Sequence, residues 1–201
     1  MFLKAFNKLL NAFFYIPSFC TFGKNQNDAM IEEQVILVNE KDEQIGLMPK
    51  QEAHEKAVLH RAFSVFIFNN KKELMLQQRA LHKYHSPGLW TNTCCSHQRD
   101  GESSLAAGKR RLKEEMGFAT ELNETTSFIY KAPFENGLTE YEYDHILVGN
   151  YNKEPQLNSK EVASWKWMSM NAIKDAIKNN PEDYTAWFKI IFDKFYKYIT
   201  L

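Results

Sequence analysis

Two adjacent thiols, Cys94 and Cys95, stand immediately before an imidazole at His97. A charge-rich segment follows, and it contains the paired carboxylates of Glu114–Glu115. Paired carboxylates can hold a divalent cation against a diphosphate, as diphosphate hydrolysis requires. Hydrolysis has no use for a neighbouring thiol, however. The combination therefore indicates chemistry on the carbon portion of a diphosphate ester.

The carboxylate pair is predicted to lie on a helix that opens at about residues 103–104 and ends at Gly117. The serines at the start can cap a helix, apolar residues follow at helical spacing, and the glycine supplies a stop. Residues four apart share a helix face, so Arg111 can form an ion pair with Glu115. Taken alone, such a charge pattern is typical of a solvated, salt-bridged surface helix.

The wider spacing of this segment resembles the Nudix box, G-x5-E-x7-R-E-U-x-E-E-x-G-U, in which U is an apolar residue. Glu102 and Arg110 stand at the first acid and the arginine of that pattern. Two positions depart from it, because Ser96 replaces the leading glycine and Arg111 replaces the acid after the arginine. In the Nudix family that acid helps to bind the metals that activate water, so its loss disfavours hydrolysis.

Segments on both sides of the altered box resemble the type 1 isopentenyl-diphosphate Δ-isomerases, which use a Nudix-like fold. In chain order these segments are residues 52–54, 59–63, 78–80, 87–92, 95–97 and 140–142. The resemblance runs from about Met30 to the C-terminus. It implies an isomerase that interconverts isopentenyl diphosphate and dimethylallyl diphosphate through a tertiary carbocation and so supplies isoprenoid biosynthesis.

The resemblance also implies a divalent metal site. Its ligands would be three histidines and two glutamates, namely His54, His60, His97, Glu140 and Glu142. Imidazoles favour Zn²⁺ and oxygen ligands favour Mn²⁺ or Mg²⁺, so all three metals stay open. Glu140 and Glu142 support the site independently, because residues two apart on a strand share a face. Two like charges side by side are unfavourable unless a cation lies between them.

Catalysis would require an acid and a base on opposite sides of the substrate, because the double bond moves by addition and removal of a proton. The resemblance assigns these roles to Cys95 and Glu142. Adjacent residues on a strand face opposite ways, so Cys94 is interpreted as a packing residue. Aromatic faces can stabilise a carbocation, and the resemblance implies Trp187 and Tyr130 for this role. Trp187 also fits an apolar helix stripe that packs in a core.

The diphosphate needs cations, since Arg binds phosphate oxygens with a two-pronged fork and Lys acts as a point charge. The resemblance implies Lys50, Arg79, Lys83 and Arg111. A cation at Arg111 would hold the diphosphate instead of helping to cleave it. Glu115 would bind Mg²⁺, which in the family bridges the diphosphate and the backbone carbonyl of the catalytic cysteine, here Cys95.

Composition excludes little but is consistent with this function. The chain has 201 residues, of which 44% are hydrophobic, which suits one globular domain with an appendage. Lysine and arginine number 25 and aspartate and glutamate also 25, so nothing favours a nucleic-acid partner. Three cysteines form no sensible disulfide framework, which favours a reducing cytoplasm. No feature of the sequence indicates an oligomeric state.

Residues 1–29 are predicted to be an appendage, and residues 30–201 the Nudix-like isomerase domain. The appendage is rich in Phe, Leu, Lys and Asn, and its apolar run is too short and too polar to cross a bilayer. A basic amphipathic helix at a membrane surface and a misassigned start, with Met30 the true beginning, fit it equally. A signal peptide fits less well, since the run lacks a clean apolar core and cleavage site.

The remaining pattern favours an α/β sandwich with a mixed sheet and flanking helices. Strands are predicted at residues 35–39, 62–69, 73–78, 90–95, 127–134, 140–151 and 164–168. Further helices are predicted at residues 171–178 and 182–198.

Two other functions compete with the isomerase. A Nudix hydrolase would not place Arg111 in the box, and a non-catalytic binding domain would not need Cys95 together with five metal ligands.

Overall fold

The computed structural model describes residues 33–134 and 137–199, so the predicted appendage and its boundary at Met30 lie outside the described residues. Within them, nine strands form one mixed sheet, flanked by four α-helices and a 3-10 turn. The elements are β1 Gln34–Val38, β2 Gln44–Pro49, α1 Lys50–Glu55, β3 His60–Phe68, β4 Glu73–Arg79, β5 Trp90–Thr91, β6 Cys94–Ser96, α2 Ser104–Met116, β7 Leu122–Pro133, β8 Thr139–Asn150, β9 Val162–Ser169, α3 Met170–Asn179, η1 Pro181–Asp183 and α4 Ala186–Ile199.

Strand β3 lies at the centre of the sheet and carries an almost uninterrupted run of buried side chains. It pairs antiparallel with β1, β4 and β6 and parallel with β8. The parallel register runs from His60 opposite Glu142 to Phe68 opposite Asn150. Because β3 is covered on both faces, its sequence reads as a continuous hydrophobic segment instead of an alternating one.

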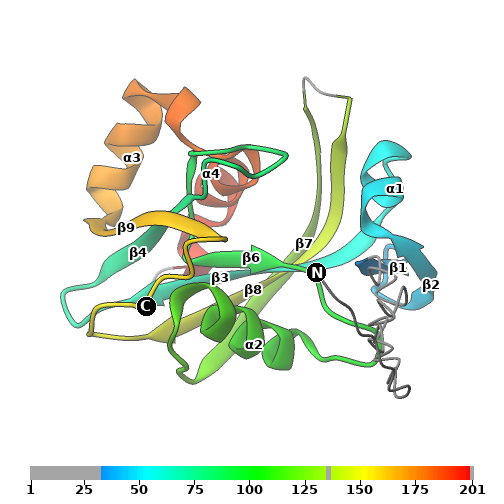
Figure 1. Ribbon diagram of the computed structural model, residues 1–201, viewed down its shortest axis with the longest axis horizontal. Coiled ribbons are helices and arrows are strands. Elements are labelled where there is room, and N and C mark those ends of the chain that lie inside the picture. Colours follow the sequence, from blue (N-terminus) through cyan, green and yellow to red (C-terminus); the bar gives the residue numbers. More distant parts are fainter. Residues whose placement is uncertain (1–32, 135–136, 200–201) are drawn as a thin grey trace, which may run out of the picture. The chain divides into compact units, whose positions relative to one another are not determined.

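Helix α2 covers one face of the sheet, and α3 and α4 cover the other (Figure 1). Successive side chains of β3 point to opposite faces of the sheet, so this strand contributes to the core on each face. Phe66 packs with α4, and Val65 packs with α2. On α2, Leu112 and Met116 lie four residues apart and are fully buried against the sheet. The predicted α/β sandwich with a mixed sheet is confirmed.

Helix α2 begins and ends where the sequence predicts. The hydroxyl of Ser103 accepts a hydrogen bond from the backbone N–H of Ala106, and Gly117 ends the helix at φ 75°. A Cβ atom at Gly117 would lie 2.3 Å from the carbonyl oxygen of Gln156. The position therefore requires glycine both for its left-handed backbone and for this close approach.

Several element boundaries differ from the prediction. The single strand predicted over residues 90–95 is wrong, because β5 ends at Thr91 and β6 begins at Cys94. Strand β2 and helix α1 were not predicted, and β7 begins five residues earlier than expected. Helix α4 begins at Ala186, because residues 181–183 form the 3-10 turn.

Over residues 33–134 and 137–199, no helix has the length and apolar character that crossing a membrane requires.

Candidate active site

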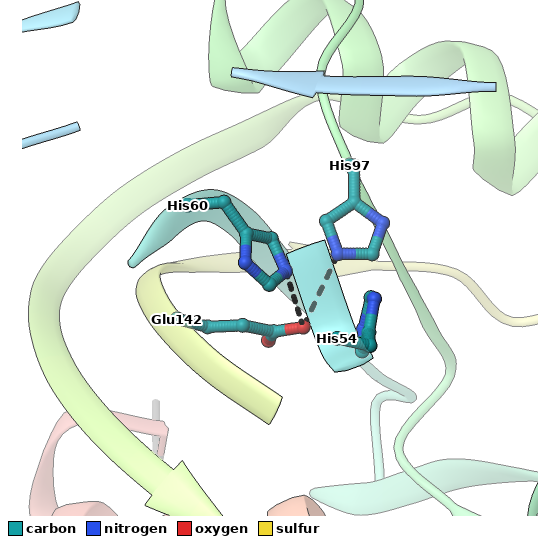
Figure 2. A group of neighbouring side chains, drawn as sticks. All are labelled: His54, His60, His97 and Glu142. Carbon is teal, nitrogen blue, oxygen red and sulfur yellow. Dashed lines mark hydrogen bonds and ion pairs between the residues drawn. The ribbon is translucent and has the colours of Figure 1, made fainter. Parts of the chain in front are cut away.

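Four of the five predicted metal ligands converge on one point (Figure 2). They come from four elements: His54 from α1, His60 from the start of β3, His97 from the segment after β6, and Glu142 from β8. One ligand atom of each lies within 4.8 Å of those of the others, and all four side chains are buried. The parallel register of β3 and β8 sets His60 directly beside Glu142.

Backbone carbonyls orient two of these imidazoles. Nδ1 of His54 donates to the carbonyl of Lys50 at 2.6 Å, and Nδ1 of His60 donates to the carbonyl of Val58 at 2.8 Å. With its proton on Nδ1, each neutral ring keeps a lone pair on Nε2, which is the form that binds metal. Nε2 of His60 lies 3.6 Å from Oε1 of Glu142 and has no hydrogen-bond partner among the described residues. A divalent cation between the two atoms would bind both.

The charge states also suit a cation. Burial lowers the pKa of His97 to about 4, so this imidazole is neutral near pH 7. Burial alone would raise the pKa of Glu142, but its contacts with His60 and His97 hold that pKa well below the usual range. Nε2 of His97 lies 3.2 Å from Oε1 of Glu142. Neutral imidazoles and an ionised carboxylate are the forms that coordinate divalent metals, so these residues fit a metal ion.

Glu140, the fifth predicted ligand, lies beside this group but not within it. Its Oε2 is 2.9 Å from the hydroxyl of Tyr130, and its Oε1 is 3.6 Å from Nε2 of His85. Burial and the neighbouring Glu142 raise the pKa of Glu140 well above the usual range. The structure thus places the two predicted acids in unlike surroundings, which shift their pKa values in opposite directions.

The two cysteines lie on opposite faces of the sheet. Cys94 is fully buried in the core under α2. Cys95 is only half-buried, packs on the opposite core, and pairs with Ser64 across the β3–β6 ladder. Burial raises the pKa of the Cys95 thiol, so this group is protonated at neutral pH. Such a thiol can donate a proton.

The two predicted aromatic residues are both buried. Trp187 lies in the first turn of α4, and its indole packs in the core on the Cys95 side of the sheet. The guanidinium of Arg79 lies 5.3 Å from the centre of this indole, and the ring of His85 lies 5.5 Å from it. Tyr130, on β7, stands directly opposite Glu142 across the β7–β8 ladder.

Three of the four predicted diphosphate-binding residues form ion pairs with carboxylates. Nζ of Lys50 lies 3.2 Å from Glu33, and Lys83 forms an ion pair with Glu161. Nη2 of Arg111 lies 3.4 Å from the same Glu161. The fourth, Arg79, donates from Nη2 to the carbonyl of His85, and its buried Nε has no partner among the described residues.

Glu115, the predicted Mg²⁺ ligand, is buried on α2. One oxygen accepts a hydrogen bond from Nη2 of Arg111 at 2.6 Å, which confirms their predicted ion pair. The other accepts from Nε2 of Gln77 at 2.9 Å. Both carboxylate oxygens are therefore occupied by donors, and the side chain has one fixed orientation.

Three residues that line this region were not singled out from the sequence: Gln77, His85 and Glu161. His85 lies close after Lys83 in the loop that follows β4, and this proximity was the available signal. Gln77 and Glu161 act through side-chain contacts with residues distant in sequence, and no local pattern marks them.

Comparison with known proteins gives a consistent result. The NUDIX domain family matches residues 58–188. Isopentenyl-diphosphate Delta-isomerase 2 of Photorhabdus laumondii is 50% identical over 161 residues, which cover 80% of this chain and 91% of that protein. Isopentenyl-diphosphate Delta-isomerase of Serratia proteamaculans is 49% identical over 161 residues, which cover 80% of this chain and 90% of that protein.

Solved structures support the fold. A protein of Deinococcus radiodurans superimposes with a TM-score of 0.67 at 18% identity, covering 81% of this chain and 99% of that one. A MutT protein of Methanosarcina mazei superimposes with a TM-score of 0.56 at 17% identity, covering 69% of this chain and 94% of that one. With sequence relatives this similar along four-fifths of its length, the chain belongs to the isopentenyl-diphosphate Δ-isomerase family within the Nudix fold.

Proposed function

We propose that this protein interconverts isopentenyl diphosphate and dimethylallyl diphosphate, as the names of its relatives state for those proteins. The observation that carries the proposal is the group of three buried histidines and Glu142, with the Cys95 thiol on β6, which pairs with β3 as β8 does. Burial raises the pKa of the Cys95 thiol, and the contacts with His60 and His97 hold the pKa of Glu142 low, so the first group suits a proton donor and the second a proton acceptor. The reaction supplies isoprenoid biosynthesis with both isomers.

The proposed chemistry moves one proton onto the substrate and one off it. The Cys95 thiol adds its proton to the terminal carbon of the double bond, which leaves a tertiary carbocation at the branched carbon. Glu142 then removes a proton from the carbon on the diphosphate side of the cation, and the new double bond forms there. The aromatic faces of Trp187 and Tyr130 stabilise the cation without offering it a nucleophile.

A divalent ion would be held by His54, His60, His97 and Glu142, with Glu140 as the fifth ligand that the family resemblance implies. We propose Mn²⁺, Zn²⁺ or Mg²⁺ for this position, since three imidazoles favour zinc and carboxylates favour the harder ions. Such an ion would supply positive charge that stabilises the carboxylate form of Glu142 and fixes its orientation. Glu142 itself removes the proton.

Four cations would bind the diphosphate: Lys50, Arg79, Lys83 and Arg111. The unpartnered Nε of Arg79, and that of Arg111, each leave a buried donor for a phosphate oxygen. Mg²⁺ would accompany the diphosphate at Glu115 and at the backbone carbonyl of Cys95. In this arrangement Arg111, which stands where the Nudix box has an acid, holds the diphosphate intact.

We further propose that residues 30–201 form the catalytic domain and that the protein works in a reducing cytoplasm. The free thiols of Cys94 and Cys95 support this location, because the reaction needs the second of them reduced. The partner is a small isoprenoid diphosphate and not a nucleic acid. A chain that begins at Met30 should keep turnover within a few-fold of the full chain, a difference below roughly 1.4 kcal/mol in the barrier.

The test is proton exchange with the solvent. Purified protein with Mg²⁺ and isopentenyl diphosphate in deuterated water should form dimethylallyl diphosphate that carries deuterium. Phosphate release, measured in parallel, should stay at background. Orthophosphate or a monophosphate ester as the main product would instead identify a Nudix hydrolase.

A further inference from the structure

Three polar residues form a chain of hydrogen bonds in the interior, next to strands β5 and β6. Thr91, Asn92 and Thr185 expose none of their surface to solvent. The hydroxyl of Thr185 donates to the hydroxyl oxygen of Thr91 at 3.0 Å, and the hydroxyl of Thr91 donates to Oδ1 of Asn92 at 2.8 Å. The described fold thus joins residues that lie 94 positions apart in the sequence.

The direction of every bond in this chain is fixed. Nδ2 of Asn92 donates to the carbonyls of Val65 at 3.2 Å and Cys94 at 2.8 Å, so both amide hydrogens are used. Oδ1 of Asn92 can then only accept, and the proton must come from Thr91. The oxygen of Thr91 in turn accepts from Thr185. A buried network in which each donor and acceptor is matched has a single arrangement and is rigid.

The two ends of the chain lie beside two residues of the proposed reaction. At one end, Asn92 holds the carbonyl of Cys94, in the peptide unit that leads directly into Cys95. At the other end, Thr185 binds the backbone of Trp90 through its N–H at 3.0 Å. The carbonyl of Thr185 accepts the N–H of Lys189 at 3.2 Å and so opens α4, two residues before Trp187.

The indole of Trp187 has no polar anchor of its own, because its Nε1 has no hydrogen-bond partner among the described residues. Its position is therefore set by packing in the core and by where α4 begins. Cation–π attraction requires the cation within about 6 Å of the ring centre, and the cation forms on the carbon next to the one that the thiol protonates. A displacement of about 1 Å between reacting groups can cost roughly 100-fold in rate.

We propose that Thr91, Asn92 and Thr185 are positioning residues that fix the Cys95 thiol relative to the Trp187 indole. The inference rests on the proposed isomerase function and assigns these residues no contact with substrate. The diphosphate-binding cations are not bonded to this chain of residues. Loss of the chain should therefore change kcat and leave KM almost unaltered.

Thr185→Val tests the inference, because it removes the donor and keeps the volume of the side chain. We expect kcat to fall by roughly 10- to 100-fold and KM for isopentenyl diphosphate to stay within about threefold. Thr185→Ser, which restores the hydroxyl, should recover most of kcat. Thr91→Val combined with Thr185→Val should lower kcat no further than either variant alone, because both break the same chain.

Thr93→Val is the matched control. Thr93 belongs to the same motif and is fully buried, and its hydroxyl donates to the carbonyl of Met75 and accepts from the N–H of Ile67. These bonds hold the sheet and do not connect to α4. The control should lower the unfolding temperature and leave kcat within about threefold at a temperature where the protein is folded.

Two results would overturn the inference while the proposed function stands. One is wild-type kcat in folded Thr185→Val, and the other is an equal fall of kcat in Thr93→Val. If Thr185→Val does not fold, Thr185→Ala measured at low temperature takes its place under the same criteria. An unaltered protein that forms no dimethylallyl diphosphate would overturn the proposed function and this inference with it.

Discussion

The hydroxyl oxygen of Tyr130 lies 2.6 Å from Oε2 of Glu142, and the same oxygen lies 2.9 Å from Oε2 of Glu140. A hydroxyl carries one proton and can donate it to one carboxyl group only. The shorter contact is to Glu142, whose pKa the contacts with His60 and His97 hold low, whereas burial and Glu142 raise the pKa of Glu140. The Tyr130 hydroxyl therefore lies between two carboxyl groups in unlike surroundings, and its proton favours Glu142.

Tyr130→Phe should lower kcat by roughly 10- to 100-fold, because a hydrogen bond to a charged group contributes about 1.5–3 kcal/mol. The phenyl ring keeps the packing, but the buried carboxyl groups lose their donor, so the unfolding temperature should also fall. Steady-state kinetics across a pH series would measure the effect and would also show an altered ionisation of the acidic pair. Unchanged kcat at every pH would show that the hydroxyl has no part in the reaction.

Cys95→Ala should remove nearly all turnover and leave the fold intact, since the thiol is the proposed proton donor. Cys94→Ala should keep turnover and lower the free energy of unfolding by about 1 kcal/mol, because it leaves a small cavity under α2. Circular dichroism, chemical denaturation and product formation would be measured on both proteins. If both folded variants lost turnover equally, the assignment of the reactive thiol to Cys95 would be wrong.

Protein purified without chelator should carry about one tightly bound divalent ion per chain. Protons compete with the metal for its ligands, and burial lowers the pKa of His97 to about 4, so this histidine stays available to the metal in mild acid. Elemental analysis after dialysis at successive pH values should find that the ion is lost as the ligands protonate in acid. Full activity in metal-free protein would contradict the site.

Glu102→Gln should lower the free energy of unfolding by about 1 kcal/mol at neutral pH. Glu102 receives two hydrogen bonds from Arg110, at 2.8 and 2.7 Å, and they lower its pKa. A lowered folded-state pKa means that the unfolded chain takes up the proton first as the pH falls. The stabilisation is therefore complete above the ordinary pKa of 4.5 and is lost as the pH falls through the folded-state value.

Denaturation at neutral and at acidic pH would show this dependence, with a difference between Glu102→Gln and wild type only at the higher pH. Glu121→Gln is the control, because the ion pair of Glu121 with Lys109 lies on the surface and should contribute nothing measurable. If Glu102→Gln and Glu121→Gln lowered the free energy of unfolding equally, the two hydrogen bonds from Arg110 to Glu102 would add no stability beyond that of a surface ion pair.

The sequence predicted those parts of the structure that local patterns encode. Helix α2 could be placed because serine caps and Gly117 mark its two ends. The opposite orientation of Cys94 and Cys95 follows from the alternation of any strand. The His and Glu ligands, in contrast, were identified through a family resemblance, because the six-residue spacing of His54 and His60 carries no structural signal of its own.

The sequence did not predict features that depend on contacts between distant segments. The predicted strand over residues 90–95 fails because the amide of Asn92 takes the carbonyl of Cys94, and a side chain thus replaces a strand partner. The family resemblance implies Glu140 as a ligand, and its shared strand face with Glu142 supports that prediction. Its hydrogen bond with Tyr130, from another strand, is a contact that no local pattern predicts.

The close approach of Gly117 to Gln156 couples two parts of the protein that the sequence keeps apart. The segment after Gln156 is tied to the end of α2, since the N–H of Asn158 donates to the carbonyl of Glu115. Three residues later it carries Glu161, which contacts both Lys83 and Arg111. A methyl group at position 117 would push this segment away from the end of α2 and would displace Glu161 from the two cations that it contacts. A glycine with no polar side chain thereby holds a distant carboxylate in place.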